Sequence, residues 1–285
     1  NGVILLSQIL DFSNASDMGE MNPGNDKSYE LALPTAAATA WYFHKVPNQP
    51  AKLEPFLKEV EHFAMNDYAL ALNKGSLLDS VTSNQIAEKL HEYTGLSVAY
   101  ILKSDLRVNV LKFQKMMLES ENKILGNLDT RFAGPEMDPL AEYPEYDPHT
   151  ATISSAFVGA FNTYVHTYLK YGKEMIFHTF GDVNPWDMRA EYMGSPYKFF
   201  PNVMPDLAAA MIYNPKLKVM LNMGYFDFGT PYFEGLFEMH HLPIPKALQD
   251  NISYAFYHSG HMVYLNPDAH KELHDNVAKF INSTH

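Results

Sequence analysis

The sequence has no cysteine among its 285 residues. This absence excludes disulfide bonds, zinc sites built on thiolates, iron–sulfur clusters and a cysteine nucleophile. It does not decide the compartment, because periplasmic and cytosolic proteins can both lack cysteine.

Positive charge is also scarce. Lys and Arg number 21 against 33 Asp and Glu, so the formal net charge is −12. Proteins that bind nucleic acid need clustered Lys and Arg to neutralise phosphates, and we therefore expect no nucleic-acid partner. No run of 18 or more apolar residues occurs, so we expect no membrane partner through a spanning helix.

Motifs that hold metals or cofactors are missing as well. No glycine-rich phosphate loop appears. His270 and His274 stand one helical turn apart, but the H-E-x-x-H order of a zinc site is broken because the glutamate is at the wrong place. We predict neither a metal nor a cofactor.

Three apolar runs have the character of buried strands, at residues 3–10, 217–223 and 252–257. The segments between them are long enough for helical crossings, which join parallel strands. The sequence therefore predicts an α/β protein with a mostly parallel sheet flanked by helices. The expected helices are 33–44, with Pro34 in its first turn, 156–169 with an aromatic core-facing side, 203–213 and 267–281.

An acid and a histidine follow the last two predicted strands. Asp227 comes after a break at Gly224, and His261 comes after a break at Ser259-Gly260. An acid and then a histidine, each just past a strand, is the order of the last two members of the Ser-Asp-His triad in α/β-hydrolases. Asp227 and His261 are the catalytic residues that we predict, and we expect a carboxylate oxygen about 2.6–3.2 Å from the imidazole Nδ1.

The sequence around these residues resembles that of one family. Asn214-Pro215-Lys216-Leu217-Lys218-Val219, Gly224-Tyr225-Phe226-Asp227 with Thr230-Pro231, and Gly260-His261-Met262 are similar to the serine carboxypeptidases, in particular their bacterial branch. The resemblance implies the α/β-hydrolase fold, release of C-terminal residues from peptide substrates, and a secreted or periplasmic location. It also implies that Met262 belongs to the substrate-binding, leaving-group pocket.

The nucleophile of such a triad is not evident. No Gly-x-Ser-x-Gly occurs, and Ser76, Ser195 and Ser259 stand beside glycine without the strand-to-helix context of a nucleophile elbow. In the family, the nucleophile lies shortly before the strand that matches residues 3–10. We therefore expect an upstream segment of the same protein to carry the nucleophile, and the chain by itself to be inactive.

Helical periodicity dominates the interval between the first strand and the last two. We predict a hydrolase core formed by 1–50 and 181–285, with a helical cap inserted at 51–180. Within the cap, residues 126–132 resemble the Gly-Arg-Leu-Asp-x-Arg segment of the bacterial carboxypeptidases. Asp129 and Arg131 in this segment are interpreted as a structural ion pair. An aromatic stretch around Trp186 either lines the substrate cleft or returns the cap to the core.

Two other functions fit the same residues. An esterase or acyltransferase uses the same triad, since specificity lies in residues outside it. A non-catalytic hydrolase remnant that binds a partner would need no nucleophile at all.

Overall fold

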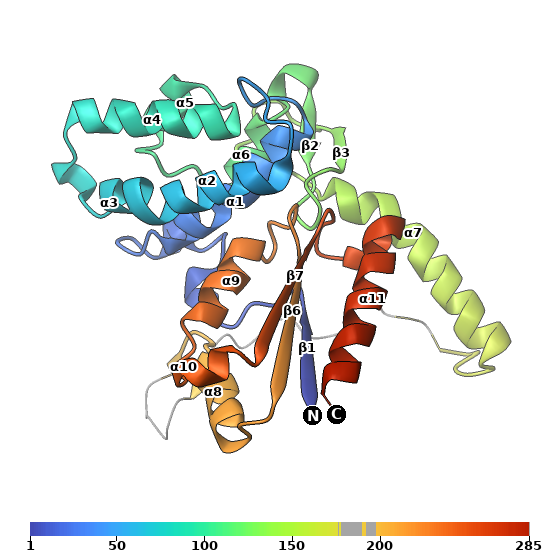
Figure 1. Ribbon diagram of the computed structural model, residues 1–285. Helices are drawn as coiled ribbons and strands as arrows, with labels where there is room; N and C mark the ends of the chain where they lie inside the picture. Colours follow the sequence, from blue (N-terminus) through green and yellow to red (C-terminus); the bar gives the residue numbers. More distant parts are fainter. Residues whose placement is uncertain (176, 178–189, 192–197, 285) are drawn as a thin grey trace.

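The computed structural model describes residues 1–175, 177, 190–191 and 198–284. Within this part, the main sheet runs in the order β1 (Gly2–Leu6), β6 (Lys218–Gly224) and β7 (Ile252–Tyr257). Both strand pairs are parallel, and β6 is the central strand (Figure 1). The α/β class and the parallel pairing of the three apolar runs are confirmed.

Helices cover both faces of this sheet (Figure 1). Met223 of β6 points toward Gly235 of α9 (Tyr232–His240) on one face. On the other face, Asn222 accepts a hydrogen bond from the Tyr257 hydroxyl, which in turn accepts one from Asn276 of α11 (Pro267–Ser283). The alternation of side chains along β6 therefore seats one helix on each face. The helices that precede β6 and β7 are α8 (Met204–Tyr213) and α10 (Lys246–Gln249).

Strand β1 forms an edge of the described sheet, because it pairs only with β6. Val3, Ile4 and Leu6 are 37%, 40% and 37% exposed. The strand ends at Leu6 because Ser7 adopts a left-handed backbone, with φ of 49°. The strand is shorter than the expected run over 3–10, and its apolar side chains are not fully buried because, among the described residues, β1 has a sheet neighbour on one edge only.

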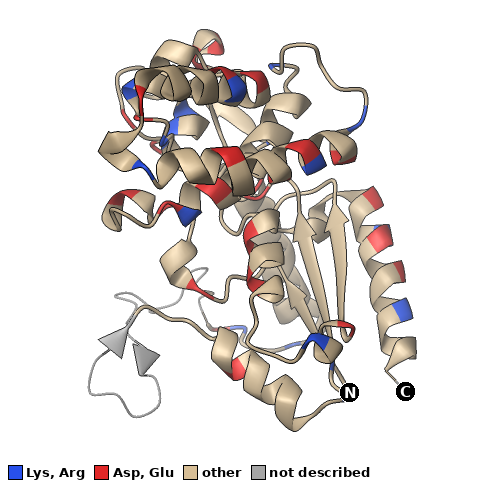
Figure 2. Ribbon diagram, turned by 60° about the vertical axis from the view of Figure 1, so that its left-hand side comes forward, with Lys and Arg blue, Asp and Glu red and all other residues tan. Residues whose placement is uncertain are grey.

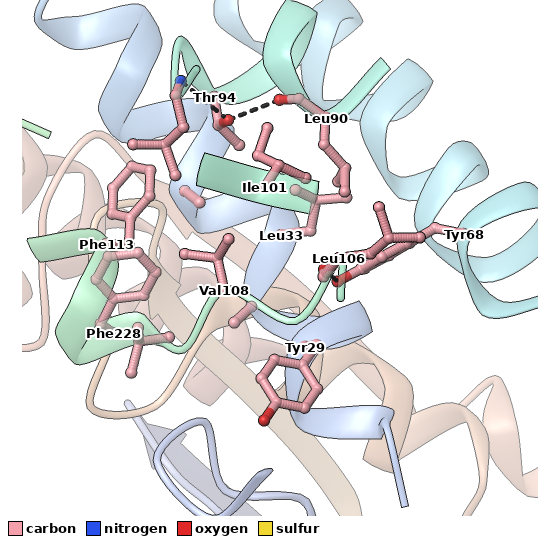
Figure 3. A pocket seen from close by; sticks show the side chains of 14 residues that line it. Tyr29, Leu33, Tyr68, Leu90, Thr94, Ile101, Leu106, Val108, Phe113 and Phe228 are labelled. Carbon is pink, nitrogen blue, oxygen red and sulfur yellow. Dashed lines mark hydrogen bonds between the residues drawn. The ribbon is translucent and has the colours of Figure 1, made fainter. Parts of the chain in front are cut away.

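A helical part stands beyond the end of the sheet where β6 and β7 finish (Figure 1). Its core gathers around α1 (Lys27–Tyr42), which contacts α2 (Leu53–Phe63). A cavity of about 30 Å³ remains inside, and Leu33, Ile101 and Phe113 are among its apolar lining (Figure 3). The other helices here are α3 (Ala69–Leu72), α4 (Ser80–Thr94), α5 (Val98–Lys103) and α6 (Val110–Met116).

Helix α1 begins six residues earlier than the sequence predicted, so Pro34 lies in its interior and not in its first turn. An interior proline lacks the N–H of the helical ladder and usually costs about 3 kcal/mol. Here 13 of the 16 residues of α1 are buried. Tertiary packing of this kind supplies most of the stability of a protein helix, and it keeps α1 intact through the proline.

The interval predicted as a helical cap also contains a short hairpin. It consists of β2 (Lys123–Leu125) and β3 (Ala133–Pro135), which pair antiparallel. Helix α7 (Pro148–Thr163) follows and passes into a π-helical turn at Tyr164–Tyr168. Asp147 is the N-cap of α7, and its carboxylate accepts the His149 N–H at 3.0 Å.

The aromatic side of α7 does not face a core. Phe157, Phe161, Tyr164 and Tyr168 are 50%, 45%, 52% and 76% exposed. Figure 1 shows α7 projecting away from the sheet. Helical spacing places these rings on one side of the helix, but another element has to cover that side before it becomes core.

Some predictions fall outside the described residues. The stretch around Trp186 is one, and the start of the second core segment at 181 is another. Nearby, β4 (Ala190–Glu191) and β5 (Lys198–Phe199) form a further antiparallel pair.

The described charges are mixed in sign. In the view of Figure 2, Lys and Arg alternate with Asp and Glu over the helical part and along α11. Among the described helices, none is both long and apolar enough to cross a bilayer.

Candidate active site

Asp227 lies in the turn that follows β6, and its side chain is completely buried. Gly224, at the end of β6, lets this turn approach the loop after β7. A Cβ atom at Gly224 would overlap the carbonyl oxygens of Ser259 and Gly260. The glycine after the apolar run is therefore a requirement of close packing between the two loops.

The structure brings His261 to Asp227. The Asp227 Oδ2 lies 2.9 Å from the His261 Nδ1, which is within the distance range that the sequence predicted. The imidazole side chain is 33% exposed while the carboxylate is buried. No described residue hydrogen-bonds to the Nε2 of His261, so the nitrogen opposite Asp227 is available to another group.

Thr230 supports the carboxylate from the next turn. Its backbone N–H donates to Asp227 Oδ1 at 3.1 Å, and its hydroxyl donates to Oδ2 at 2.7 Å. The Thr230 hydroxyl thus helps to orient the Asp227 carboxylate. Pro231, the next residue, stands just before α9.

The electrostatics of the pair favour a proton on His261. Burial lowers the pKa of His261, but the hydrogen bond and the charge of Asp227 raise it more, so that the net pKa lies above its usual value. Burial also raises the pKa of Asp227, against the hydrogen bonds from His261 and Thr230. A carboxylate that stabilises the adjacent imidazolium is what acid–base catalysis by histidine requires.

The Ser7 side chain contacts His261, but it bonds to the backbone of the histidine and not to its imidazole ring. Its hydroxyl donates to the carbonyl oxygen of His261 at 2.6 Å. The Ser259 hydroxyl donates to the Val263 carbonyl at 3.2 Å. Within the described residues, no serine hydroxyl is hydrogen-bonded to the imidazole.

Met262 lies directly after the histidine and is partly exposed. Its assignment to a substrate pocket stays a prediction.

The described residues contain no group of three or more His, Cys, Asp or Glu placed to hold a metal ion. His274 of the i, i+4 histidine pair lies beside Asp275, with 3.1 Å between Nδ1 and Oδ1.

Two buried carboxyl groups of α9 were not anticipated from the sequence. Glu238 accepts the N–H groups of Leu10 at 3.0 Å and Asp11 at 2.7 Å, and the side-chain amide of Gln8 at 3.1 Å. Burial nevertheless dominates and raises the pKa of Glu238 to about 7. Glu234, one turn earlier, is buried with no described partner for either oxygen, and burial raises its pKa well above the usual value. The available signal was a pair of acids at i and i+4 on an otherwise apolar helix.

The loop at the tip of the β2–β3 hairpin also reaches the pair. Asp129 and Arg131 form the expected ion pair, with 2.7 Å between Oδ2 and Nη2, and Asp129 is buried. The prediction placed this pair in the cap as a local structural feature. The structure shows in addition that its members bond to the loop of His261.

Comparisons with known proteins add no relative: no family model, no curated protein and no solved structure matches the chain.

Proposed function

We propose that Asp227 and His261 are the acid and the base of a serine-type hydrolase built on the α/β-hydrolase fold, and that its reaction is the release of C-terminal residues from peptides. One observation carries this proposal. A fully buried carboxylate lies 2.9 Å from Nδ1 of a partly exposed imidazole, and both residues follow adjacent parallel strands. The motif resemblance to the serine carboxypeptidases supports the choice of a peptide substrate.

In this mechanism, Nε2 of His261 takes the proton from a serine hydroxyl as its oxygen attacks the scissile carbonyl carbon. The imidazolium then returns that proton to the leaving amine as the C–N bond breaks. Asp227 keeps the Nδ1 proton in place and stabilises the imidazolium without becoming protonated itself. A water molecule, deprotonated by the same nitrogen, then attacks the acyl carbon; the bond to the serine oxygen breaks, and the imidazolium returns the proton to that oxygen as the acid is released.

The nucleophile in this proposal comes from an upstream segment of the same protein. Within the described residues β1 pairs only with β6, and its other edge supports that part of it. An edge strand with unpaired N–H and C=O groups can accept a further strand, and Val3, Ile4 and Leu6 offer apolar side chains for such a neighbour to cover. A secreted or periplasmic location belongs to the same proposal and rests on the motif resemblance alone.

A non-catalytic role is the second candidate, and one observation favours it. Among the described residues, no serine hydroxyl is hydrogen-bonded to the imidazole. A remnant that only binds a partner would keep the folded Asp227–His261 loops without turnover. An esterase or acyltransferase would share the pair and differ only in the substrate.

The test uses protein produced from the complete coding sequence, with release of the C-terminal amino acid from an N-blocked dipeptide and of the alcohol from the matching ester. We expect His261→Ala to lower kcat/KM for the dipeptide at least about 10³-fold. His274→Ala, which removes an exposed histidine of α11, is the matched control and should stay within about two-fold.

A serine-directed fluorophosphonate probe separates the candidates. Labelling of a serine upstream of residue 1 would support the proposed nucleophile, and labelling of a serine within 1–285 would refute that part. Cleavage of the ester alone would identify an esterase. No hydrolysis and no labelling would favour the non-catalytic role.

A further inference from the structure

We propose that the loop 126–132 between β2 and β3 is a clamp that fixes His261 relative to Asp227, with Asp129 and Arg131 as its positioning residues. This inference rests on the proposed function for its catalytic meaning. The geometry that carries it is independent of any activity, because all of its contacts are hydrogen bonds of the folded chain.

The clamp holds the backbone of the histidine loop at two successive amides. The N–H of His261 donates to the carbonyl oxygen of Leu128 at 2.7 Å. The N–H of Gly260 donates to Oδ2 of Asp129 at 3.1 Å. A Cβ atom at Gly260 would overlap the Leu128 carbonyl oxygen and the side chain of Asp129, so only glycine admits this approach.

The same loop holds the backbone on both sides of Asp227. The N–H of Thr130 donates to the carbonyl oxygen of Phe226 at 2.9 Å, and the N–H of Phe228 donates to the carbonyl oxygen of Asn127 at 2.9 Å. One short loop is therefore bonded to the two neighbours of the acid and to the histidine itself. Its shape sets the spacing between the two side chains.

Arg131 stiffens this loop and closes it onto the sheet. Its guanidinium grips Asp129 with two hydrogen bonds, Nε to Oδ1 at 2.9 Å and Nη2 to Oδ2 at 2.7 Å. Its Nη1 donates to the carbonyl oxygen of His258 at 2.7 Å, and the guanidinium lies 5.0 Å from the centre of the Phe226 ring. A two-pronged bond of this kind fixes orientation as well as charge, which a single lysine contact does not.

A purely structural ion pair is the competing explanation, and the chain contains a matched control for it. Arg107 grips Asp26 with the same two-pronged geometry, at 2.6 and 2.7 Å. That pair joins the start of α1 to the segment after α5 and makes no bond to the loops of Asp227 or His261. Loss of either pair should lower thermal stability, but only loss of the Asp129–Arg131 pair should alter His261.

The experiment is an NMR titration of the His261 ring, assigned with a His261→Gln spectrum, in the wild type, Asp129→Ala, Asp129→Asn and Asp26→Ala. We expect Asp129→Ala to lower the pKa of His261 toward its usual value, because a looser histidine loop weakens the bond to Asp227. Asp129→Asn keeps an oxygen that can accept the Gly260 N–H, so the pKa of His261 in this variant should lie between the wild-type and Asp129→Ala values. Asp26→Ala should leave the pKa of His261 unchanged at a similar loss of Tm.

An unchanged pKa in Asp129→Ala, or an equal change in Asp26→Ala, would overturn the clamp. If Asp129→Ala does not fold, amide hydrogen exchange of the wild type decides: Gly260 and His261 should exchange as slowly as the core of β6, and fast exchange would refute the proposal. Neither readout needs turnover. The clamp can therefore be tested even if the protein hydrolyses none of the substrates. If the clamp is refuted, the expected effect of His261→Ala on activity still stands.

Discussion

Glu238 makes stability depend on pH in a direction opposite to that of most carboxylates. Its pKa is raised from the usual 4.5 to about 7 in the folded protein. Between these values the folded state binds the proton more tightly than the unfolded state does. The contribution of this proton is fully present below pH 4.5 and is lost as the pH rises through 7.

The magnitude follows from the two pKa values. At about 1.4 kcal/mol per pKa unit, the loss between pH 4.5 and pH 8 is at most about 3 kcal/mol. The side chain is fully buried, so solvent screens the carboxyl group only weakly. The pKa of Glu234 is also raised by burial, so its contribution to stability is likewise lost as the pH rises.

The perturbation is Glu238→Gln, which is neutral at every pH. The glutamine oxygen can still accept the N–H of Asp11. Its amide can donate to the Oε1 of Gln8, a buried oxygen that has no partner among the described residues. We expect the variant to be as stable as the wild type near pH 5 and more stable, by up to about 3 kcal/mol, at pH 8.

The assay is urea denaturation at several values between pH 4.5 and pH 8, with Glu272→Gln on the exposed side of α11 as the control. The unfolding free energy of the wild type should fall across this range, and the slope should decrease in Glu238→Gln only. A wild-type curve that is flat or rising, or an equal slope in Glu238→Gln, would refute the reasoning.

Three further predictions test the packing around the site. Gly260→Ala should destabilise the fold by about 2 kcal/mol or more in urea denaturation, because the new Cβ meets the Leu128 carbonyl oxygen and Asp129; an unchanged midpoint would contradict the close approach. Thr230→Val removes the hydroxyl on Asp227 and should cost about 1–2 kcal/mol, with Thr284→Val at the C-cap of α11, where the hydroxyl makes a solvent-exposed bond to the Ile281 carbonyl, as a control near zero. Val3→Lys should reduce self-association of the 285-residue chain in light scattering without changing its Tm, since β1 is an open edge; unchanged association would mean that this edge is not the contact.

Much of the candidate site could be predicted from residue order. Apolar runs of strand length predicted the parallel pair β6 and β7, and parallel strands that are neighbours in a sheet bring their carboxyl ends to one edge. Residues placed just after them, Asp227 and His261, therefore had to lie close together. Topology brings the two residues to the same edge of the sheet, while the 2.9 Å contact itself also depends on how the loops pack at Gly224 and against residues 126–132.

The clamp and the buried acids could not be predicted in this way. Asp129 is about 130 residues from Gly260 in the chain, and a short hairpin tip has no periodicity that reveals its partner. Glu238 stands out in the sequence only as one of two acids that lie one turn apart on an apolar helix. Its burial appears only when the segment after β1 folds across α9 and delivers two backbone N–H groups to it.

Periodicity by itself determined which residues share one side of a helix, as it did for the rings of α7. Tertiary structure alone decided what covers those sides: α9 and α11 cover β6, while Phe161 of α7 and Ile4 of β1 stay exposed. The physical reason is that the repeat of a side-chain pattern is a property of the local backbone. Burial depends on segments that are distant in the chain and meet only in the folded state.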